Sequence, residues 1–362
     1  MRQNLAPIID GTAKSDGLGA EAAAAMIRLR TNDGRDAPIG STHGSGPGAW
    51  QPTPPAFLAA QTPWVAFVRP FTYQSPSQFR PGPPPSLASD MWADAFNEVK
   101  LRGALVGSNR SAAETIQATF WTDNAPTQYN RYLRRLTAEQ QLSAADKARL
   151  YAEINMAGAD AGIGCFDAKY AYGWWRPVTA IRNADADDNP ATVADPLWTS
   201  SVVTPNHPEY PSAHACVSGA IADTLADFFG TDHVVSTIES AVTHTAVEFA
   251  RFRDIYRDVH EARILGGLHY RFSMNAGRRL GRHVSNRLTR HYFRRVSGDR
   301  DERRSRQRSQ RLADRGTVGG GGAGTSPCPV RGSWHRSSRR AIRPARTSAA
   351  DGCCGHIGAG TG

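Results

Sequence analysis

The amino-acid sequence predicts an all-α protein, and three observations indicate this fold class. Apolar residues recur every three or four positions along most of the first 296 residues, which is the spacing of one helix face. Residues 21–30 (EAAAAMIRLR) are strong helix formers, and Ser143 stands where a helix N-cap is expected. No stretch alternates apolar and polar residues convincingly, so we expect no strands.

The same spacing gives the order of the expected helices. They cover residues 21–30, 87–105, 111–121, 128–136, a longer stretch that begins at Ser143 and includes residue 161, 212–229, 238–256 and 263–290. Polar loops are expected at 185–196 and 205–211. Residues 46–86 are rich in Pro and in aromatic side chains, which predicts an irregular segment packed on the helical body with its aromatic rings packed inward.

Composition divides the chain into two parts. Residues 1–296 are expected to form a single helical catalytic domain. Residues 297–362 hold thirteen Arg, no Lys and five acidic residues, a net charge of +8 out of +10 for the chain. They have few large apolar residues, which predicts a disordered tail or sequence read out of frame. Because the body is nearly neutral, we expect no nucleic-acid partner for it.

Several classes of protein are excluded or left open by the composition. No apolar run approaches the ~20 residues of a transmembrane helix, so we expect none. The first seventeen residues resemble no secretory signal, so a cytoplasmic location is the default, and secretion stays open if the N-terminus is truncated. The five Cys form neither a zinc pattern nor a disulfide framework. A homo-oligomer stays open.

The first segment with chemical meaning is the stretch from Lys169 to Pro177 (KYAYGWWRP). Lys169 and Arg176 are seven residues apart, so on one helix they would project from the same face, about 10 Å apart along the axis. Two cations beside a pair of Trp suit a shared anion in a partly dry site. Two solvated surface charges are the simpler alternative.

The second segment is Pro211-Ser-Ala-His214, which leads into an apolar helix. A helix N-terminus presents free backbone N–H groups and binds anions. Ser212 adds a hydroxyl donor, and His214 is placed for proton transfer. The alternative is that Ser212 is only an N-cap and His214 only a satisfied polar residue.

The third segment contains Arg263 and His269. On an ideal helix these residues lie about 120° out of register, and Gly266 and Gly267 between them would allow a break that lets both side chains converge. An ordinary helix with a core-facing His269 is the alternative.

Taken together, the three segments resemble the superfamily of vanadium-dependent haloperoxidases, bacterial acid phosphatases and type 2 phosphatidic acid phosphatases. That superfamily carries Lys-x6-Arg-Pro, Pro-Ser-Gly-His and Ser-Arg-x5-His-x3-Asp in this order. The stretches WWRPVTAIR and GLHYRF look most like its bacterial haloperoxidase branch. The resemblance extends over about residues 10–294 and implies a helical bundle of the haloperoxidase and acid phosphatase type.

The resemblance also implies a role for each motif residue. Lys169, Arg176 and Arg263 would bind the oxygens of phosphate or vanadate, with Ser212 and the backbone N–H of Ala213 as further donors. His214 would be the acid–base group. His269 would be the axial vanadium ligand, or the nucleophile that attacks phosphorus. We expect His207, in the loop before the second motif, either to support this network or to be a surface residue.

Three positions depart from the family pattern. Ala213 stands in place of Gly, Ala262 in place of Ser, and Ser273 in place of Asp. A carboxylate four residues after His269 would make its imidazole a better nucleophile, whereas Ser273 would orient the ring without adding charge. The change should therefore hurt a phosphohistidine step more than vanadium ligation.

Three functions follow from these observations. The preferred one is a haloperoxidase that oxidises halide with hydrogen peroxide and uses vanadate as its cofactor. The alternative is a phosphomonoesterase that acts on a phosphate ester through a phosphohistidine and needs no cofactor. A protein of a different class, which binds polyanions through the Arg-rich tail and has no catalytic activity, is the third.

Overall fold

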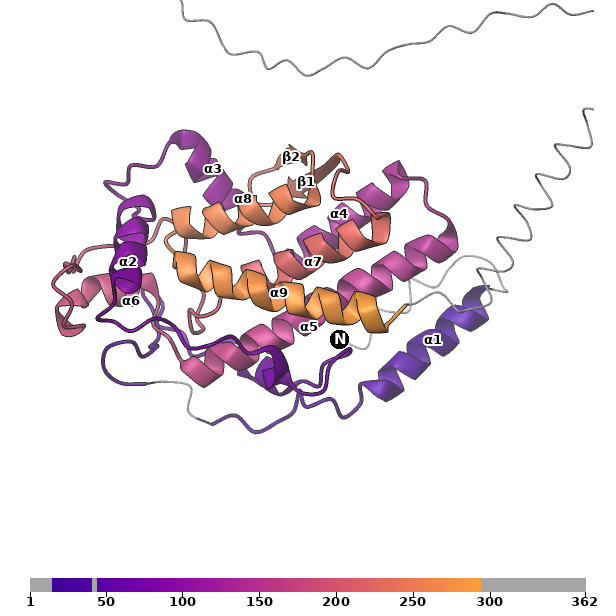
Figure 1. Ribbon diagram of the computed structural model, residues 1–362, viewed down its shortest axis with the longest axis horizontal. Helices are drawn as coiled ribbons and strands as arrows, with labels where there is room; N and C mark the ends of the chain where they lie inside the picture. Colours follow the sequence, from indigo (N-terminus) through magenta and orange to yellow (C-terminus); the bar gives the residue numbers. More distant parts are fainter. Residues whose placement is uncertain (1–14, 41–43, 294–362) are drawn as a thin grey trace, which may run out of the picture. The chain divides into compact units, whose positions relative to one another are not determined.

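The computed structural model describes residues 15–40 and 44–293 (Figure 1). Its α-helices are α1 (Ser15–Leu29), α2 (Asp90–Arg102), α3 (Ala112–Phe120), α4 (Ala125–Glu139), α5 (Ala144–Tyr172), α6 (Pro177–Arg182), α7 (Ala213–Phe229), α8 (Phe252–Leu265) and α9 (Arg271–His291). Short 3-10 helices are η2 (Pro63–Phe67), η3 (Pro76–Phe79) and η4 (Ala184–Ala186). The predicted all-α helical bundle is confirmed, with one small β-hairpin as an exception.

Helix α7 lies at the centre of the bundle and packs against α5, α8 and α9 (Figure 1). Its backbone nearly touches that of α9, because the facing residues of α9 are glycines. A Cβ atom at Gly277 would come within 2.7 Å of the Ser212 carbonyl oxygen, and one at Gly281 within 2.3 Å of the Cys216 carbonyl oxygen. The close contact therefore depends on glycine at both positions.

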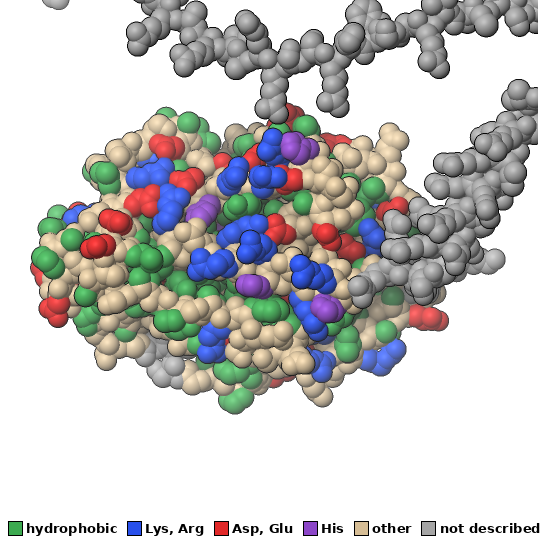
Figure 2. Space-filling model, in the orientation of Figure 1, with side chains coloured by type: hydrophobic (Ala, Val, Ile, Leu, Met, Phe, Trp, Pro, Cys, Tyr) green, Lys and Arg blue, Asp and Glu red, His purple; other side chains and the backbone are tan. Residues whose placement is uncertain are grey.

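The outer face of α9 is basic. Figure 2 shows Lys and Arg side chains gathered along this face with acidic side chains between them. An ion pair joins Arg278 of α9 to Asp223 of α7, with 2.6 Å between Nη2 and Oδ1. The opposite face of α9 is buried, and Leu280, Val284 and Leu288 lie in the core. The helix is thus amphipathic, as a surface helix of a bundle should be.

The predicted helix 263–290 is divided in two. Helix α8 ends at Leu265, and the backbone changes direction at Gly267, whose φ is +73°. Helix α9 begins four residues later, at Arg271. A Cβ at Gly267 would lie 2.5 Å from the Gly103 carbonyl oxygen, so no other residue fits there. The break that the glycine pair predicted is confirmed, and it places His269 in the connection between the helices.

The predicted helix 238–256 is wrong in its first half. An antiparallel hairpin of β1 (Ser236–Ser240) and β2 (Thr245–Phe249) occupies that stretch, and α8 begins only at Phe252. Three of the five residues of β1 are buried in strict alternation, and β-branched side chains such as Ile238 and Val247 pair across the hairpin. Such residues favour the pleated surface of a sheet, and the alternation was too short to notice in the sequence.

The Pro- and aromatic-rich segment at residues 46–86 contains only the turns η2 and η3 and otherwise irregular backbone. Trp50 and Tyr73 are buried, whereas Phe57, Trp64 and Phe67 are at least 40% exposed. The aromatic side chains of the segment are therefore divided between the core and the surface, and the prediction that they pack inward is wrong for the three exposed ones.

Two predictions concern other parts of the chain. The expected tail, residues 297–362, lies outside the described residues. Within the part of the chain that the structure describes, no helix is long and apolar enough to cross a bilayer.

Candidate functional site

Lys169 and Arg176 do not share a helix, so the geometry predicted for them is wrong. Helix α5 ends at Tyr172, and Gly173 with a φ of +55° turns the chain away. Arg176 is the N-cap residue of the next helix, α6, whose first residue is Pro177. The two cations reach the same region from different elements, because the left-handed turn at Gly173 redirects the backbone between them.

The three basic residues of the motifs are all buried. Lys169 and Arg176 have no exposed surface, and Arg263 is 2% exposed. Burial lowers the pKa of Lys169 to about 8, that of Arg176 to about 10 and that of Arg263 to about 9. Arg176 lowers the pKa of the other two further, so the cations are close enough to repel one another.

Arg176 connects the first motif to the third. Its Nη1 atom lies 3.3 Å from Nε2 of His269 and donates a hydrogen bond to the Leu268 carbonyl oxygen at 3.0 Å. The remaining guanidinium atoms contact His207, with Nε donating to its carbonyl oxygen at 2.8 Å and Nη2 lying 3.0 Å from its ring Nδ1. His207 therefore contacts Arg176, as expected if this residue supports the network of motif residues and is not a surface residue.

Lys169 holds the loop that leads into the second motif. Its ammonium donates to the carbonyl oxygens of Pro208 at 2.8 Å and of Glu209 at 2.9 Å. Both acceptors are neutral, and within residues 15–40 and 44–293 no carboxylate forms an ion pair with Lys169, Arg176 or Arg263. The buried Glu209 carboxylate acts on Lys169 and Arg176 from a longer distance and raises the pKa of both. One carboxylate does not balance three buried cations, so a bound anion would stabilise the site.

The second motif lies at the start of α7. Ser212 is the N-cap residue, and its hydroxyl oxygen accepts from the N–H of Ala215 at 3.5 Å. Ala213 is the first residue of the helix, so its N–H belongs to the first turn, which has no partners within the helix. Ser212 therefore caps the helix, as the simpler alternative expected, at the end where an anion would be favoured.

His214 and Arg263 meet at one backbone carbonyl, that of Trp121. Arg263 Nη1 donates to it at 3.1 Å, and a hydrogen bond to the same residue partly offsets the fall in the pKa of His214. Burial lowers that pKa well below its usual range, and Arg263 lowers it further. Two buried atoms, His214 Nε2 and Arg263 Nε, have no hydrogen-bond partner among the described residues.

A carboxylate that the sequence did not single out contacts His269. The ring Nδ1 lies 2.8 Å from Oε1 of Glu209, and the same oxygen accepts from the backbone N–H of Tyr270 at 3.1 Å. Both side chains are almost fully buried. Burial raises the pKa of Glu209 to about 7, although Lys169 and Arg176 oppose the rise.

Glu209 thus has the orienting role that the sequence assigned to Ser273, and that assignment is wrong. No hydrogen bond joins Ser273 to the His269 ring, and the buried Ser273 hydroxyl has no hydrogen-bond partner among the described residues, although it is near enough to Glu209 to help lower its pKa. Ser273 lies in the first turn of α9, whereas His269 lies in the connection before this helix begins, so the four-residue spacing does not bring the two side chains together. The available signal was a lone carboxylate in the Pro-rich loop directly before the second motif.

The arrangement fits a tetrahedral oxyanion such as vanadate or phosphate. Three buried cations and a helix N-terminus supply positive charge and donors, and Arg263 Nε is a buried donor without a partner. With Nδ1 of His269 donating to Glu209, its Nε2 atom keeps a lone pair, as a metal ligand or a nucleophile requires. Burial and the cations also keep this ring neutral by lowering its pKa.

The helical bundle has the fold of the bacterial vanadium haloperoxidases. A bacterial vanadium-dependent iodoperoxidase of known structure is 27% identical, with a TM-score of 0.66 over 76% of this chain and 68% of that one. The apo form of a bacterial vanadium-dependent chloroperoxidase is 17% identical, with a TM-score of 0.61 over 76% of this chain and 74% of that one. At that identity the second match supports the fold alone.

Sequence comparisons agree with the structural ones. The family model described as the VCPO second helical-bundle domain matches residues 149–298. The vanadium chloroperoxidase of Curvularia inaequalis is 28% identical over 40% of this chain, and the match spans only 29% of that relative's length. The resemblance to the vanadium haloperoxidases that the three motifs predicted is thereby confirmed.

Proposed function

We propose that the protein is a vanadium-dependent haloperoxidase that oxidises halide with hydrogen peroxide. Lys169, Arg176 and Arg263 would hold the oxygens of vanadate, together with Ser212 and the backbone N–H of Ala213. His269 would bind the vanadium through Nε2. Bound vanadate supplies a pentavalent Lewis acid at which peroxide becomes reactive toward halide, without a change in oxidation state.

The observation that carries the proposal is the burial of three cations that have no ion-pair partner among the described residues. Each would lose several kcal/mol of solvation on burial, and the nearby Glu209 carboxylate offsets only part of this cost, so an anion that shares the site would stabilise all three. Charge-assisted hydrogen bonds to that anion would contribute about 1.5–3 kcal/mol each. The choice of vanadate over phosphate is supported by the relatives, which are named as vanadium haloperoxidases.

His214 is the residue suited to move protons. Its lowered pKa keeps the imidazole neutral at ordinary pH, and Nε2 has no partner among the described residues. This atom can accept a proton from incoming hydrogen peroxide and return it to the oxygen that leaves. The nearby Arg263 favours release of the proton, because it disfavours a second positive charge on the ring.

The phosphomonoesterase remains a second candidate, and one contact favours it. The carboxylate that a phosphohistidine step requires is present, since Glu209 occupies the Nδ1 side of His269. The absence of Asp at position 273 is therefore no argument against a nucleophilic His269. In this reaction His269 Nε2 would attack phosphorus and His214 would protonate the leaving oxygen.

The third candidate, polyanion binding by residues 297–362, concerns residues outside the described part of the chain and stays a prediction. Deleting those residues would separate it from both enzymes. Binding to heparin or DNA should then vanish while enzyme activity survives.

The deciding experiment is an assay of the purified protein for peroxide-dependent bromination, with and without added vanadate, alongside p-nitrophenyl phosphate. We expect bromination that requires vanadate and saturates with it, and little phosphatase activity. Brisk hydrolysis of the phosphate ester together with no vanadate-dependent bromination would establish the phosphatase instead. Lys169→Met should abolish whichever activity is found, because it removes one of the oxyanion-binding cations.

A further inference from the structure

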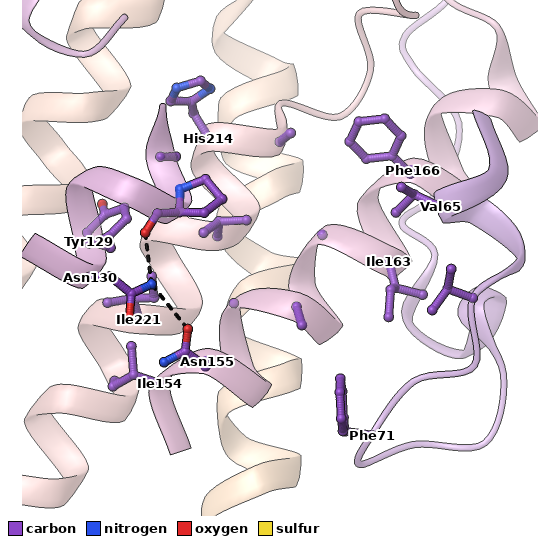
Figure 3. A pocket seen from close by; sticks show the side chains of 18 of the residues that line it. Val65, Phe71, Tyr129, Asn130, Ile154, Asn155, Ile163, Phe166, His214 and Ile221 are labelled. Atoms are coloured by element: carbon purple, nitrogen blue, oxygen red, sulfur yellow. Dashed lines mark hydrogen bonds between the residues drawn. The ribbon is translucent and has the colours of Figure 1, made fainter. Parts of the chain in front are cut away.

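A cavity of about 590 Å³ lies between α4, α5, α7 and residues 64–71 (Figure 3). Its lining is mainly apolar, and its charged members are Asp33 and the two Arg that form ion pairs with it, Arg30 and Arg35. The floor is formed by core side chains, namely Leu133, Ile154 and Ile221, each of which is at most 4% exposed. Val65 and Phe71 form the opposite wall (Figure 3). A cavity of this volume and lining matches sites that enclose a small organic molecule.

The wall on the side of Phe71 is held in place by one buried carboxylate, Asp160 of α5. Its two oxygens accept from the backbone N–H of Phe71 at 2.6 Å and of Thr72 at 2.9 Å, and the Thr72 hydroxyl adds a third bond. The Arg30 guanidinium, which also lines the cavity, lies 4.1 Å from the centroid of the Phe71 ring. The wall is therefore fixed rather than collapsed into the cavity.

Most polar groups that line the cavity are already hydrogen-bonded. Asn130 Nδ2 donates to the Pro126 carbonyl oxygen and to Asn155 Oδ1 (Figure 3). Asn155 Nδ2 donates to the Tyr151 carbonyl oxygen. Tyr129 donates its hydroxyl hydrogen to Ser218. Because these donors are occupied, the cavity favours an occupant with an apolar body over a polar one.

The cavity adjoins the proposed reaction centre. Ala213 and His214, the first two residues of α7, form part of its lining, and His214 lies at one end of the view in Figure 3. A molecule held in the cavity would therefore lie beside the residue that handles protons at the oxyanion site. Short distance matters here, because an oxidised halogen generated next to a bound acceptor reacts before it diffuses away.

We propose that this cavity binds an apolar organic substrate with an electron-rich ring, which receives the halogen. The proposal rests on the proposed haloperoxidase function. The overall reaction is R–H + X⁻ + H₂O₂ + H⁺ → R–X + 2 H₂O. Peroxide is reduced by two electrons as its O–O bond breaks, the halide is oxidised, and the carbon exchanges its proton for the halogen.

Gly162 of α5 offers a direct test, because it lines the cavity and a Cβ there would have nothing within 4 Å. The series Gly162→Ala, Gly162→Leu and Gly162→Phe fills the cavity step by step. Binding of 1-naphthol is measured by calorimetry without peroxide. We expect the Kd to rise with side-chain volume, by about tenfold or more for Phe and little for Ala.

A second measurement uses competition during turnover. 1-Naphthol and the charged 4-hydroxybenzenesulfonate are brominated together, and the product ratio is compared with that from reagent hypobromous acid. Wild-type protein should favour 1-naphthol more than the reagent does, and Gly162→Phe should return the ratio to that of the reagent at an unchanged rate of peroxide consumption. Melting temperatures identify any variant that fails to fold, in which case Gly162→Leu decides.

The outcomes separate this proposal from the haloperoxidase itself. No bromination by wild-type protein with vanadate would overturn the proposed function, and the calorimetry would still decide whether the cavity binds 1-naphthol. Failure of 1-naphthol to bind, or equal binding by all four proteins, would overturn the organic site even if bromination is fast. A wild-type product ratio equal to that of the reagent would likewise overturn it.

Discussion

Oε1 of Glu209 lies 2.8 Å from Nδ1 of His269, and this contact joins a loop before one motif to the central residue of another, sixty residues further along the chain. The backbone N–H of Tyr270 contacts the same oxygen, so the carboxyl is held from two sides. The pair fixes which nitrogen of His269 carries the hydrogen. Nε2 then carries the lone pair, which accepts a hydrogen bond from Arg176 Nη1 at 3.3 Å.

Replacing this carboxylate should weaken the oxyanion site. In Glu209→Gln the amide oxygen can still accept from Nδ1, but the negative charge that makes Nε2 electron-rich is lost. We expect vanadate affinity to fall by about 10–100-fold, the usual effect of changing a group that supports a metal ligand. Isothermal titration with vanadate measures it. Ser273→Ala is the matched control, and an equal loss in that variant would remove Glu209 from its assigned role.

Adding a carboxylate at position 273 should do harm. Ser273 is fully buried next to Glu209, so Ser273→Asp would place two acidic groups in one dry site. We expect a fall in melting temperature of about 5 °C or more, as an unpaired buried group produces, and no gain in phosphatase turnover. Thermal denaturation and hydrolysis of p-nitrophenyl phosphate report the two effects. A large rise in turnover would mean that Glu209 does not act on His269.

Oxyanion binding should weaken as the pH rises through about 8. The pKa of Lys169 in the free protein is lowered to about 8, so above this pH its ammonium loses the proton and the site loses a positive charge. Each pH unit beyond that point should cost up to about tenfold in affinity. Sulfate is a suitable probe because its own charge does not change, and its Kd can be measured between pH 7 and 8.5. Lys169→Met should bind sulfate weakly and lose the decline due to Lys169, keeping only the decline that ionisation of Glu209, with a pKa of about 7, causes.

Replacing His214 and replacing His269 should have different effects on oxyanion binding and on turnover. His214→Ala should lower turnover by about 10²–10⁴-fold, the range of a positioned acid–base group, and leave sulfate or vanadate binding nearly intact. His269→Ala should remove vanadate binding and turnover together. Steady-state rates and calorimetry on both variants test this division. Equal losses of vanadate affinity in both would contradict it.

Much of the site could be predicted because each motif carries its own local chemistry. The first turn of α7 and the glycine break before His269 follow from Ser212 and Gly267, whose preferences act over a few residues. The relative placement of Lys169 and Arg176 could not be predicted, because the left-handed turn at Gly173 ends α5 between them. A seven-residue spacing has meaning only inside a continuous helix.

Glu209 and the hairpin show two other limits. The role of Glu209 depends on a partner sixty residues away, and no local pattern carries that information. The hairpin contains strands of five residues each, too short for an alternation to stand out from the helical spacing around it. Their β-branched residues were the available signal, and packing against the core settled the outcome.

Because the cavity wall is attached through Asp160, such an enzyme could change its substrate preference during divergence. Residues 64–71 carry none of the proposed oxyanion-binding groups. Asp160 of α5 accepts from the backbone N–H of Phe71 and of the adjacent Thr72, a group that any residue except Pro provides. Side chains along this wall can therefore be exchanged while the hydrogen bonds to Asp160 are kept. New substrate preferences can arise on such a segment without a loss of the reaction, which makes it the natural place for relatives to differ and for directed evolution to begin.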